Sequence, residues 1–585
     1  MLYRLPAAAV LAIVCASVLW ASQGPAGQST PDITGLWGSE TTFGPQVSGE
    51  LTLTQLSEIW TLRVGGFEVS AAAKGDSLRL ALPGGQGELR AWLDAGGNDV
   101  RAYWVQPAGN LVPYATPVTL ERARAGMWRG TVEPLAERFS LYLHVQRQPD
   151  GTLKGAFHNP EMNWNGRAPW FRVAVEGESV TFVDPASGRK RFVQSFDAGR
   201  RQIGMDFGGP VMLSPRAPDQ AIGFYPRTPA PSSYIYREPV ASRDGWVTAR
   251  AADVGVDESM LKTAVERILK TDPVGDNVSR IHALLVARRG KLVLDEYFFG
   301  FTESRPHDLR SASKTFTSVM AGVAMDRGAR FTTDTPAWSL LPRDQVGAET
   351  DARKRAITVG QLLTHSSGLA CDDNDSNSPG NEDTMQQQTK VDWNRYALDL
   401  PMAHDPGTTY AYCSGGINLV GTIVREVTSA WLPDYFDRYI ARPMHIHRYY
   451  TNLMPSGEAY AGGGVSMRPR DFLKFGQMYL DGGVWKGRQI VSKAWVERST
   501  ARQIAAPNGS TDGFGWHRYT LTSGGRTYQE YEASGNGGQF LMVVPDLDLV
   551  VVMTGGNYGQ YGVWRTFREE FVPALILPAA VPPRK

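Results

Sequence analysis

The first part of the chain alternates between hydrophobic and polar residues in short runs, as β-strands do when one face is buried. Glu50–Thr54, Ser77–Leu82 and Phe139–Val145 are three such runs, and Gly, Pro, Asp and Asn residues that favour turns separate them. The pattern starts at residue 31 and continues to about residue 235. It predicts an all-β N-terminal region.

This region contains a weak internal repeat. Gly35-Leu-Trp-Gly and Gly126-Met-Trp-Arg-Gly open two units, which close on Pro117-Val-Thr-Leu-Glu-Arg and Pro210-Val-Met-Leu-Ser-Pro-Arg. The repeat predicts two related sandwich- or barrel-like modules, residues 31–124 and 125–225, or two halves of one larger sheet assembly. The tryptophans are interpreted as packing residues, although exposed aromatic side chains of such modules could also bind a ligand.

The pattern changes after residue 225. Residues 226–249 are rich in Pro, Ser and Tyr and lack periodicity, so they are predicted to form a linker. Glu258–Leu269 has helical periodicity, and Ile281–Ala287 with Lys291–Tyr297 forms a hairpin-like pair of apolar runs.

A second apolar pair lies near the C-terminus, at Gln539–Val544 and Leu547–Thr554. Strands at both ends of residues 250–578, with helices between them, predict an α+β domain. We expect its antiparallel sheet to be assembled from the two ends of this region. One predicted helix begins at Ser311.

Composition and charge change this picture little. A chain of 585 residues is long for one hydrophobic core, which predicts roughly two to four domains. The 60 basic and 59 acidic residues leave a net charge of +1. This balance does not favour a nucleic acid or an anionic membrane surface as a partner.

The chain opens with the layout of a secretory signal. Arg4 precedes an uncharged apolar run from Pro6 to Ala21, and small or turn-forming residues follow. Residues 1–26 are therefore predicted to be removed on export to the periplasm or the exterior. An uncleaved anchor is disfavoured because the run is slightly short for a membrane span. A lipoprotein signal is disfavoured because bulky residues precede Cys15.

Candidate chemistry lies in the run Arg310-Ser-Ala-Ser-Lys-Thr-Phe-Thr-Ser. Ser311 and Lys314 are three residues apart, so on a helix both side chains lie on one face. A serine hydroxyl needs an adjacent base, and a lysine can serve when burial or positive charge lowers its pKa. Ser-x-x-Lys alone is a weak pattern. Ser313 is interpreted as structural because its side chain turns to another face.

Three further segments follow in order, and they strengthen this interpretation. They are Leu362-Leu-Thr-His-Ser-Ser-Gly-Leu, Pro406-Gly-Thr-Thr-Tyr-Ala-Tyr-Cys-Ser-Gly-Gly and Ala461-Gly-Gly-Gly-Val-Ser-Met-Arg-Pro-Arg-Asp. With the Ser-x-x-Lys run, they resemble the serine β-lactamase and penicillin-binding-protein superfamily, in particular class C β-lactamases and related esterases and peptidases. The resemblance implies acyl transfer without a metal or an organic cofactor.

The resemblance also implies a role for each matching residue. Ser311 corresponds to the acylated serine, Lys314 to its base, and Tyr412 to the phenol that passes a proton to the leaving group. The last role requires a phenolate, or a phenol coupled to Lys314, because an isolated tyrosine titrates near pH 10. Ser414 would complete the hydrogen-bond network.

A third family element is a strand that carries Lys-Thr-Gly or His-Thr-Gly, and Ala533-Ser-Gly-Asn matches it best. Ser534 and Gly535 fit, and the backbone N–H of Asn536 would join that of Ser311 in an oxyanion hole. Ala533 departs from the pattern, since in the β-lactam-directed members a cation at this place helps to hold the substrate carboxylate. The departure favours an ester or amide that lacks this carboxylate.

Without the signal, two cysteines remain, Cys371 and Cys413. An even pair in an oxidising compartment is a candidate disulfide, and two separate buried thiols are the alternative. The resemblance places both near one cleft, which favours the pairing. Residues 371–383 resemble a calcium loop only superficially and are interpreted as an exposed acidic lid. His365 is interpreted as packing its loop and not as a general base.

Together these observations predict an exported serine hydrolase that acts on a small-molecule or peptide ester or amide. A DD-peptidase or β-lactamase, acting on D-amino-acid-type substrates, is the alternative within the superfamily. A catalytically silent binding protein that acts through its β modules also stays open. Export is compatible with an association with the cell envelope.

Overall fold

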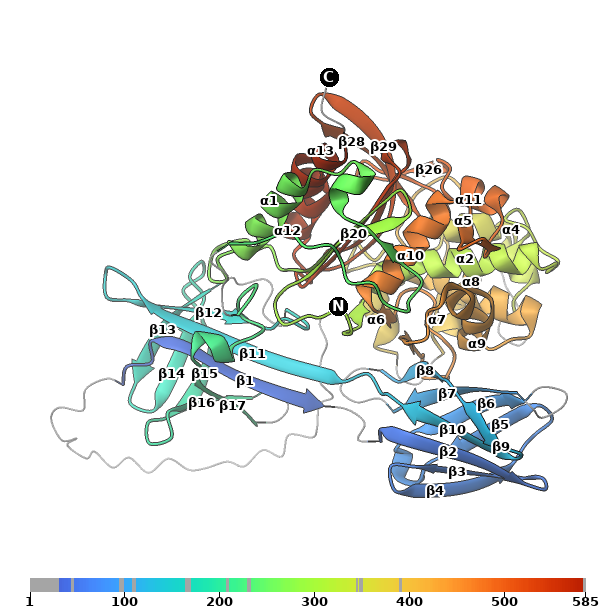
Figure 1. Cartoon of the computed structure of the whole chain (residues 1–585), viewed down its shortest axis with the longest axis horizontal. Helices are drawn as coiled ribbons and strands as arrows, with labels where there is room; N and C mark the ends of the chain where they lie inside the picture. Colours follow the sequence, from blue (N-terminus) through green and yellow to red (C-terminus); the bar gives the residue numbers. More distant parts are fainter. Residues whose placement is uncertain are drawn as a thin grey trace.

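A computed structural model describes residues 31–43, 47–93, 99–107, 112–163, 170–206, 210–228, 233–342, 346, 351–388 and 392–581. The predicted signal, residues 1–26, lies outside this set. The described chain forms a barrel and a two-sheet sandwich, which lie side by side below an α+β domain in Figure 1. The predicted architecture, an all-β region followed by an α+β domain, is confirmed. None of the helices within these ranges is long and apolar enough to cross a bilayer.

The barrel is closed, because its first strand hydrogen-bonds to both its second and its last strand. Trp37 lies in its core among buried aliphatic and phenylalanine side chains. In barrel order the strands are β1 (Gly35–Phe43), β11 (Glu137–Arg147), β12 (Leu153–His158), β13 (Phe171–Glu176), β14 (Ser179–Val183), β15 (Lys190–Asp197), β16 (Gln202–Asp206) and β17 (Pro210–Pro215).

The sandwich packs two antiparallel sheets around a core that includes Trp60, Trp104 and Trp128. Its first sheet has the order β4 (Phe67–Ala72), β3 (Ile59–Val64), β2 (Gly49–Leu56), β10 (Met127–Val132) and β9 (Glu121–Arg124). Its second sheet contains β5 (Ser77–Ala81), β6 (Glu88–Leu93), β7 (Val100–Gln106) and β8 (Tyr114–Val118).

The two β units do not divide between residues 124 and 125 as expected, because each unit contains a strand from the other repeat. Strand β1, from the first repeat, lies in the barrel, whereas β10, from the second repeat, pairs with β2 in the sandwich. Alternating hydrophobic residues define which face of a strand is buried but not which strand lies beside it. Trp37 and Trp128, the tryptophans of the two repeat motifs, are 1% and 2% exposed, so both are packing residues as interpreted.

The α+β domain is built on a nine-stranded sheet whose centre pairs β19 (Ile281–Arg288) with β31 (Leu549–Gly555). The prediction of a sheet assembled from both ends of this region is therefore confirmed. The sheet is antiparallel except where β18 meets β20. Its other strands are β18 (Val247–Thr248), β20 (Lys291–Tyr297), β30 (Gln539–Val544), β29 (Arg526–Gly535), β28 (His517–Ser523), β27 (Thr511–Asp512) and β26 (Ile504–Ala505).

Helices cover both faces of this sheet. On one face the core contains α1 (Glu258–Leu269), η9 (Phe567–Ile576) and α13 (Leu577–Ala580). On the other it contains α2 (Lys314–Asp326), α8 (Ser414–Thr428) and α10 (Pro469–Leu480). The expected linker 226–249 packs on the domain where it is described, since β18 pairs with β20 and Tyr234 is buried in the first core.

The remaining helical segments are short and lie in connections. They are η1 (Pro83–Gly85), η2 (Pro218–Gln220), η3 (Ala251–Val254), η4 (Arg310–Ser313), η5 (Ala337–Ser339), α4 (Ala352–Ala356), α5 (Val359–Leu363), α6 (Glu382–Gln386), α7 (Trp393–Asp399), α9 (Leu432–Phe436), η6 (Asp437–Ala441), η7 (Arg442–Met444), α11 (Lys493–Ser499), η8 (Pro545–Leu547) and α12 (Tyr561–Thr566).

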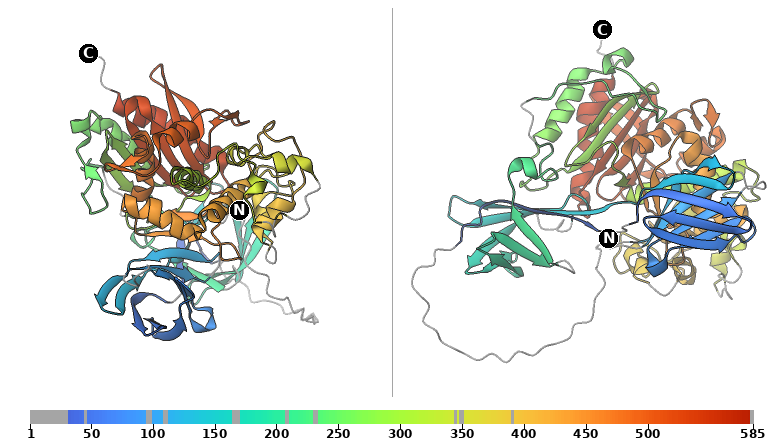
Figure 2. Two further views of the ribbon diagram at one scale, coloured as in Figure 1. Left: turned by 90° about the vertical axis from the view of Figure 1, so that its right-hand side faces the viewer. Right: turned by 60° about the horizontal axis from the view of Figure 1, so that its bottom comes forward.

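One sheet runs from the sandwich into the α+β domain. Strand β8 pairs with β22 (Tyr449–Asn452), which pairs with β23 (Val465–Met467), and β23 pairs with β21 (His307–Asp308). The sandwich and the α+β domain lie against each other in both views of Figure 2. The small two-stranded ribbon β24 (Val484–Trp485) and β25 (Arg488–Gln489) lies apart from these sheets.

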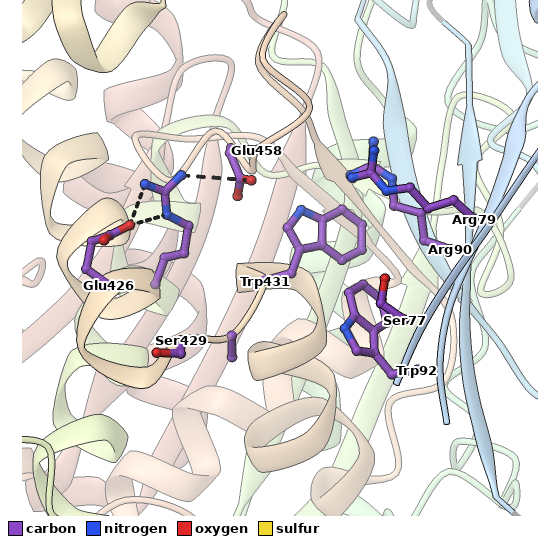
Figure 3. A pocket seen from close by; sticks show the side chains of 10 residues that line it. Ser77, Arg79, Arg90, Trp92, Glu426, Ser429, Trp431 and Glu458 are labelled. Carbon is purple, nitrogen blue, oxygen red and sulfur yellow. Dashed lines mark hydrogen bonds and ion pairs between the residues drawn. The ribbon is translucent and has the colours of Figure 1, made fainter. Parts of the chain in front are cut away.

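The same two parts also meet through side chains. Asp434 accepts hydrogen bonds from Tyr103 at 2.9 Å and from Arg101 at 3.1 Å. Trp92 of the sandwich stacks on Trp431 of the α+β domain, with 5.5 Å between ring centres (Figure 3). A groove of about 320 Å³ lies at this contact, and we refer to it as the interdomain groove.

Candidate active site

Ser311 lies in the short turn η4, immediately before helix α2. The residue before it, Arg310, has a φ of 50°, in the left-handed region, and its N–H donates to Asp308 at 2.9 Å. The chain therefore turns sharply from strand β21 into the helix. The helix predicted to begin at Ser311 starts as one turn of 3-10 helix, η4, and continues as the α-helix α2.

Two glycine-containing segments pack closely against this turn. A Cβ atom on Gly535 would lie 2.3 Å from the carbonyl oxygen of Leu309, so only glycine lets strand β29 come this near. On another side, the N–H of Val465 donates to Ser313 Oγ at 3.1 Å, and the Leu309 N–H donates to the Val465 carbonyl. Ser313 thus holds the glycine-rich segment 461–465 in place, a structural role.

The structure brings Ser311, Lys314 and Tyr412 together. Lys314 Nζ lies 3.0 Å from Ser311 Oγ and 4.9 Å from the centre of the Tyr412 ring. The Tyr412 hydroxyl lies near the side chains of both Ser311 and Lys314, and its interactions with them lower the pKa of the phenol. A hydroxyl nucleophile, an amine and a phenol therefore lie in one cluster.

The pKa of Lys314 differs from the sequence-based expectation. Burial lowers it, but the nearby Tyr412, Glu382 and Asp373 outweigh burial, so the pKa lies above that of an ordinary lysine. Burial also raises the pKa of Tyr412, against the opposing effect of Lys314 and the hydrogen bond with Ser311. The resting site therefore holds a lysine ammonium beside a neutral phenol, and the pair must lose one proton before it can act as a base.

His365 holds the backbone on both sides of Tyr412. Its Nδ1 accepts the Cys413 N–H at 3.1 Å, and its carbonyl accepts the Ala411 N–H at 2.8 Å. The imidazole lies 4.4 Å from the Tyr412 ring, centre to centre. Burial and Lys314 lower the pKa of His365 to about 3, so it stays neutral. These contacts agree with the interpretation of His365 as a packing residue.

Cys371 and Cys413 form a disulfide, as predicted, with 5.2 Å between their Cα atoms. Cys413 follows Tyr412 directly and caps the N-terminus of helix α8, because its Sγ accepts the Gly416 N–H at 3.1 Å. The disulfide therefore links the loop that carries Tyr412 to the acidic segment. Disulfides are typical of oxidising compartments.

Asp373 is a site residue that the sequence interpretation missed. Its carboxylate accepts hydrogen bonds from the N–H of Ser414 at 2.9 Å and from the Ser414 hydroxyl at 2.6 Å. It also accepts one from the N–H of Glu382. Burial and the like charge of Glu382 raise the pKa of Asp373 to about 7, while Lys314 opposes this. Ser414 thus connects to the network through Asp373.

The acidic segment is only partly the exposed lid that was expected. Residues 374–377 are exposed, but Asp373 turns toward Ser414 and Lys314. Within the described ranges, no group of three or more His, Cys, Asp or Glu is arranged to hold a metal ion.

Strand β29 places the residues of the third motif. Ala533 is 1% exposed, and its partner across the strands is Leu541, so the methyl group lies in the core. Ser534 lines the cavity that also contains Ser311 and Lys314. Asn536 follows at the end of the strand, where its side chain accepts the Gly559 N–H at 2.9 Å. The oxyanion role of the Asn536 backbone remains a prediction.

A second residue that the sequence interpretation missed is His517. It lies at the start of β28, lines the same cavity as Ser311, and has its Nδ1 2.9 Å from Asp512 Oδ1. Its ring centre lies 6.3 Å from that of Tyr412. A lone histidine after an aromatic residue carries no recognisable motif, so no sequence pattern pointed to it.

Known proteins are similar to the part of the chain that contains this site. The sequence model of the Beta-lactamase family matches residues 279–560. The chain is 25% identical over 369 residues to the 6-aminohexanoate-dimer hydrolase of Paenarthrobacter ureafaciens, covering 58% of this chain and 92% of that protein. It is also 25% identical over 318 residues to penicillin-binding protein 4 of Amycolatopsis lactamdurans, covering 46% of this chain and 80% of that protein.

Among solved structures, the octameric penicillin-binding protein homologue from Pyrococcus abyssi matches with a TM-score of 0.42 and 18% identity, over 54% of this chain and 78% of that chain. The family match spans the domain from strand β19 to the C-terminal helices and contains Ser311, Lys314 and Tyr412. The domain formed by residues 279–560 therefore matches the beta-lactamase family, and the relatives named as hydrolases support a serine hydrolase.

Proposed function

We propose that the chain is an exported enzyme that forms an acyl-enzyme on Ser311 and hydrolyses a small ester or amide. The observation that carries the proposal is the cluster in which Lys314 Nζ lies 3.0 Å from Ser311 Oγ and the Tyr412 hydroxyl interacts with both side chains. Once the Lys314–Tyr412 pair has lost one proton, the serine hydroxyl has a proton acceptor within hydrogen-bond distance.

The reaction then has two halves. Ser311 Oγ attacks the carbonyl carbon of the substrate, and its proton passes to the Lys314–Tyr412 pair. The backbone N–H groups of Ser311 and Asn536 are proposed to stabilise the resulting oxyanion. The leaving group takes the proton from Tyr412 as its bond to the acyl carbon breaks. Water then attacks the acyl carbon, and the same pair accepts its proton. As the bond from the acyl carbon to Ser311 Oγ breaks, the pair returns a proton to Ser311 Oγ, and the acid is released.

The pKa directions predict how the rate depends on pH. Because the pKa of Lys314 is raised, the pair is fully protonated and inactive at low pH and gains base strength as it loses a proton. We expect kcat/KM on a neutral ester to rise with pH across the neutral and alkaline range. A rate that is highest in acid would contradict the proposed base.

The test of the proposal is labelling with a fluorophosphonate probe, which reacts with activated serines. Wild-type protein should be labelled, and Ser311→Ala should not. Ser313→Ala is the matched control, because Ser313 bonds to Val465 and not to Lys314. A folded wild-type protein that resists labelling would instead favour the binding-protein alternative.

Export is part of the proposal and has its own test. The pattern of residues 1–26 and the Cys371–Cys413 disulfide support an oxidising compartment outside the cytoplasm. Mass spectrometry of the mature protein should give an N-terminus after Ala21 or Ala26. A protein that retains Met1 would contradict cleavage.

The relatives support two substrate classes. One is named as a hydrolase of the 6-aminohexanoate dimer, and another as a penicillin-binding protein. The second name favours the alternative of a DD-peptidase or β-lactamase. Turnover of nitrocefin distinguishes a β-lactamase from an ester or amide hydrolase. Rapid turnover that Ser311→Ala abolishes would favour a β-lactamase. Slow or absent turnover, together with efficient ester hydrolysis, would favour the leading proposal.

A further inference from the structure

His517 occupies a position from which it faces the reacting groups. It lines one cavity together with Ser311, Lys314 and Ser534, and its side chain is 14% exposed. The ring lies 6.3 Å from the Tyr412 ring, centre to centre, at an angle of 31°. The residue comes from β28, the strand beside the third-motif strand β29.

Asp512 fixes how the imidazole is presented. Its Oδ1 lies 2.9 Å from His517 Nδ1 and accepts the Ser510 hydroxyl at 2.7 Å, and its side chain is 2% exposed. Tyr410 lies near the same carboxylate, which raises the pKa of its phenol. Since Nδ1 is next to Asp512, Nε2 is the ring nitrogen left to interact with a molecule in the cavity.

Other charged groups surround the imidazole. Burial lowers the pKa of His517, but the Asp512 carboxylate more than compensates, so the pKa lies above that of an ordinary histidine. Glu532 acts in the same direction and Arg568 against it. The titratable groups that face this region from other elements are Lys314, His365, Asp373, Tyr410 and Tyr412. The Asp512 carboxylate therefore favours the imidazolium form of His517 on the wall of the cavity.

We propose that His517, held by Asp512, determines specificity by binding a carboxylate of the substrate beside the scissile bond. This inference rests on the proposed function. An imidazolium N–H and the Ser534 hydroxyl are both donors on the wall of one small cavity, and an anionic acceptor satisfies both. Ala533 has no ionisable group, and its methyl group lies in the core. The substrate class becomes a carboxylate-bearing ester or amide, in contrast to the carboxylate-free substrate favoured by the sequence.

The test compares esters that differ only in a carboxylate. The half ester p-nitrophenyl glutarate is matched with p-nitrophenyl pentanoate, and 3-acetoxybenzoate is matched with phenyl acetate. The two pairs place the charge on the acyl side and on the leaving-group side of the scissile bond. For at least one pair, kcat/KM of the wild-type chain should be higher for the charged ester.

In His517→Gln this preference should fall by about 10- to 100-fold, the range of a hydrogen bond to a charged group. The fall should come mainly from a higher KM for the charged ester. His447 is exposed and away from the cavity, so His447→Gln is the matched control and should keep the preference. A wild type without a preference in either pair, or a His517→Gln variant that keeps it, would overturn the inference.

The pH profile separates charge recognition from a purely structural role. With a raised pKa, His517 is charged below that pKa, so the preference should be present at lower pH and vanish as pH rises through it. Asp512→Asn removes the carboxylate that raises the pKa, and the loss should then occur at lower pH. An unchanged profile in Asp512→Asn would also count against the inference.

A failure of the proposed function can be told apart from a failure of the role of His517. If Ser311→Ala hydrolyses the neutral esters as fast as the wild type, the proposed function fails. If the wild type hydrolyses them through Ser311 without any carboxylate preference, only the role of His517 fails.

Discussion

The active-site cavity and the interdomain groove contain nearly the same contact with different surroundings. In the cavity, Lys314 Nζ lies 4.9 Å from the centre of the Tyr412 ring. In the groove, the Arg90 guanidinium lies 5.0 Å from the centre of the Trp431 ring; both side chains are labelled in Figure 3. Both are cation–π contacts, and both residues are largely buried.

The difference lies in what else each cation touches. Lys314 has a serine hydroxyl at 3.0 Å and a phenol that can exchange a proton with it. Arg90 donates to Glu88 and to the Gly457 carbonyl at 3.1 Å, and a guanidinium does not lose its proton in proteins. One contact is therefore suited to move protons, and the other to hold two parts of the chain together.

The largest effect should come from Lys314→Met. A general base typically contributes about 10²- to 10⁴-fold, so kcat/KM for a neutral ester should fall by that factor. Circular dichroism should show a folded protein. Arg90→Met is the matched change in the groove and should leave kcat/KM unchanged. Equal loss of activity in the two variants would remove the distinction between the two contacts.

Removing the disulfide should affect the active-site cavity and not the interdomain groove. The cysteines are 42 residues apart, and closing a loop of that length is worth about 4 kcal/mol in the chain-entropy estimate. The double variant Cys371→Ser/Cys413→Ser should lose free energy of unfolding of that order and part of its activity, since Tyr412 adjoins Cys413. Denaturant unfolding measures the first effect. Sensitivity of the double variant to reductant would show that the effect is not due to this bond.

In the interdomain groove, the indole rings of Trp92 and Trp431 should contribute more to the free energy of unfolding than the Arg90 guanidinium. Trp431→Ala should lower the free energy of unfolding by about 2–4 kcal/mol, somewhat below the usual range for a fully buried tryptophan. A double-mutant cycle with Trp92→Ala should give a coupling of about 1 kcal/mol. Activity per folded molecule should stay the same, and a large fall in kcat would mean that the groove also shapes the active site.

The smallest effect should be that of Arg90→Met on stability. A cation–π contact of this intermediate burial is worth about 1 kcal/mol, and the loss of the Gly457 hydrogen bond adds about as much again. Thermal unfolding measures the sum. A loss as large as that of Trp431→Ala would show that Arg90, and not the stacked rings, holds the two parts together.

The comparison also shows what could be predicted from the sequence. Ser311, Lys314 and Tyr412 lie in segments with fixed spacing and order, and strands β19 and β31 are long apolar runs, so both were predictable. Asp373 and His517 were not, because polarity alone does not show which carboxylate or imidazole in a polar loop turns inward. Similarly, the alternation in β1 and β10 predicts strands but leaves their partners open.

The pairing of β8 with β22 has a consequence for shorter forms of the chain. A protein that begins at the α+β domain would leave β22 as an unprotected edge, with free N–H and C=O groups next to the turn that carries Ser311. Such edges pair with other chains and cause aggregation. The N-terminal β region would thus be needed for solubility of the enzyme, whether or not it ever touches a substrate.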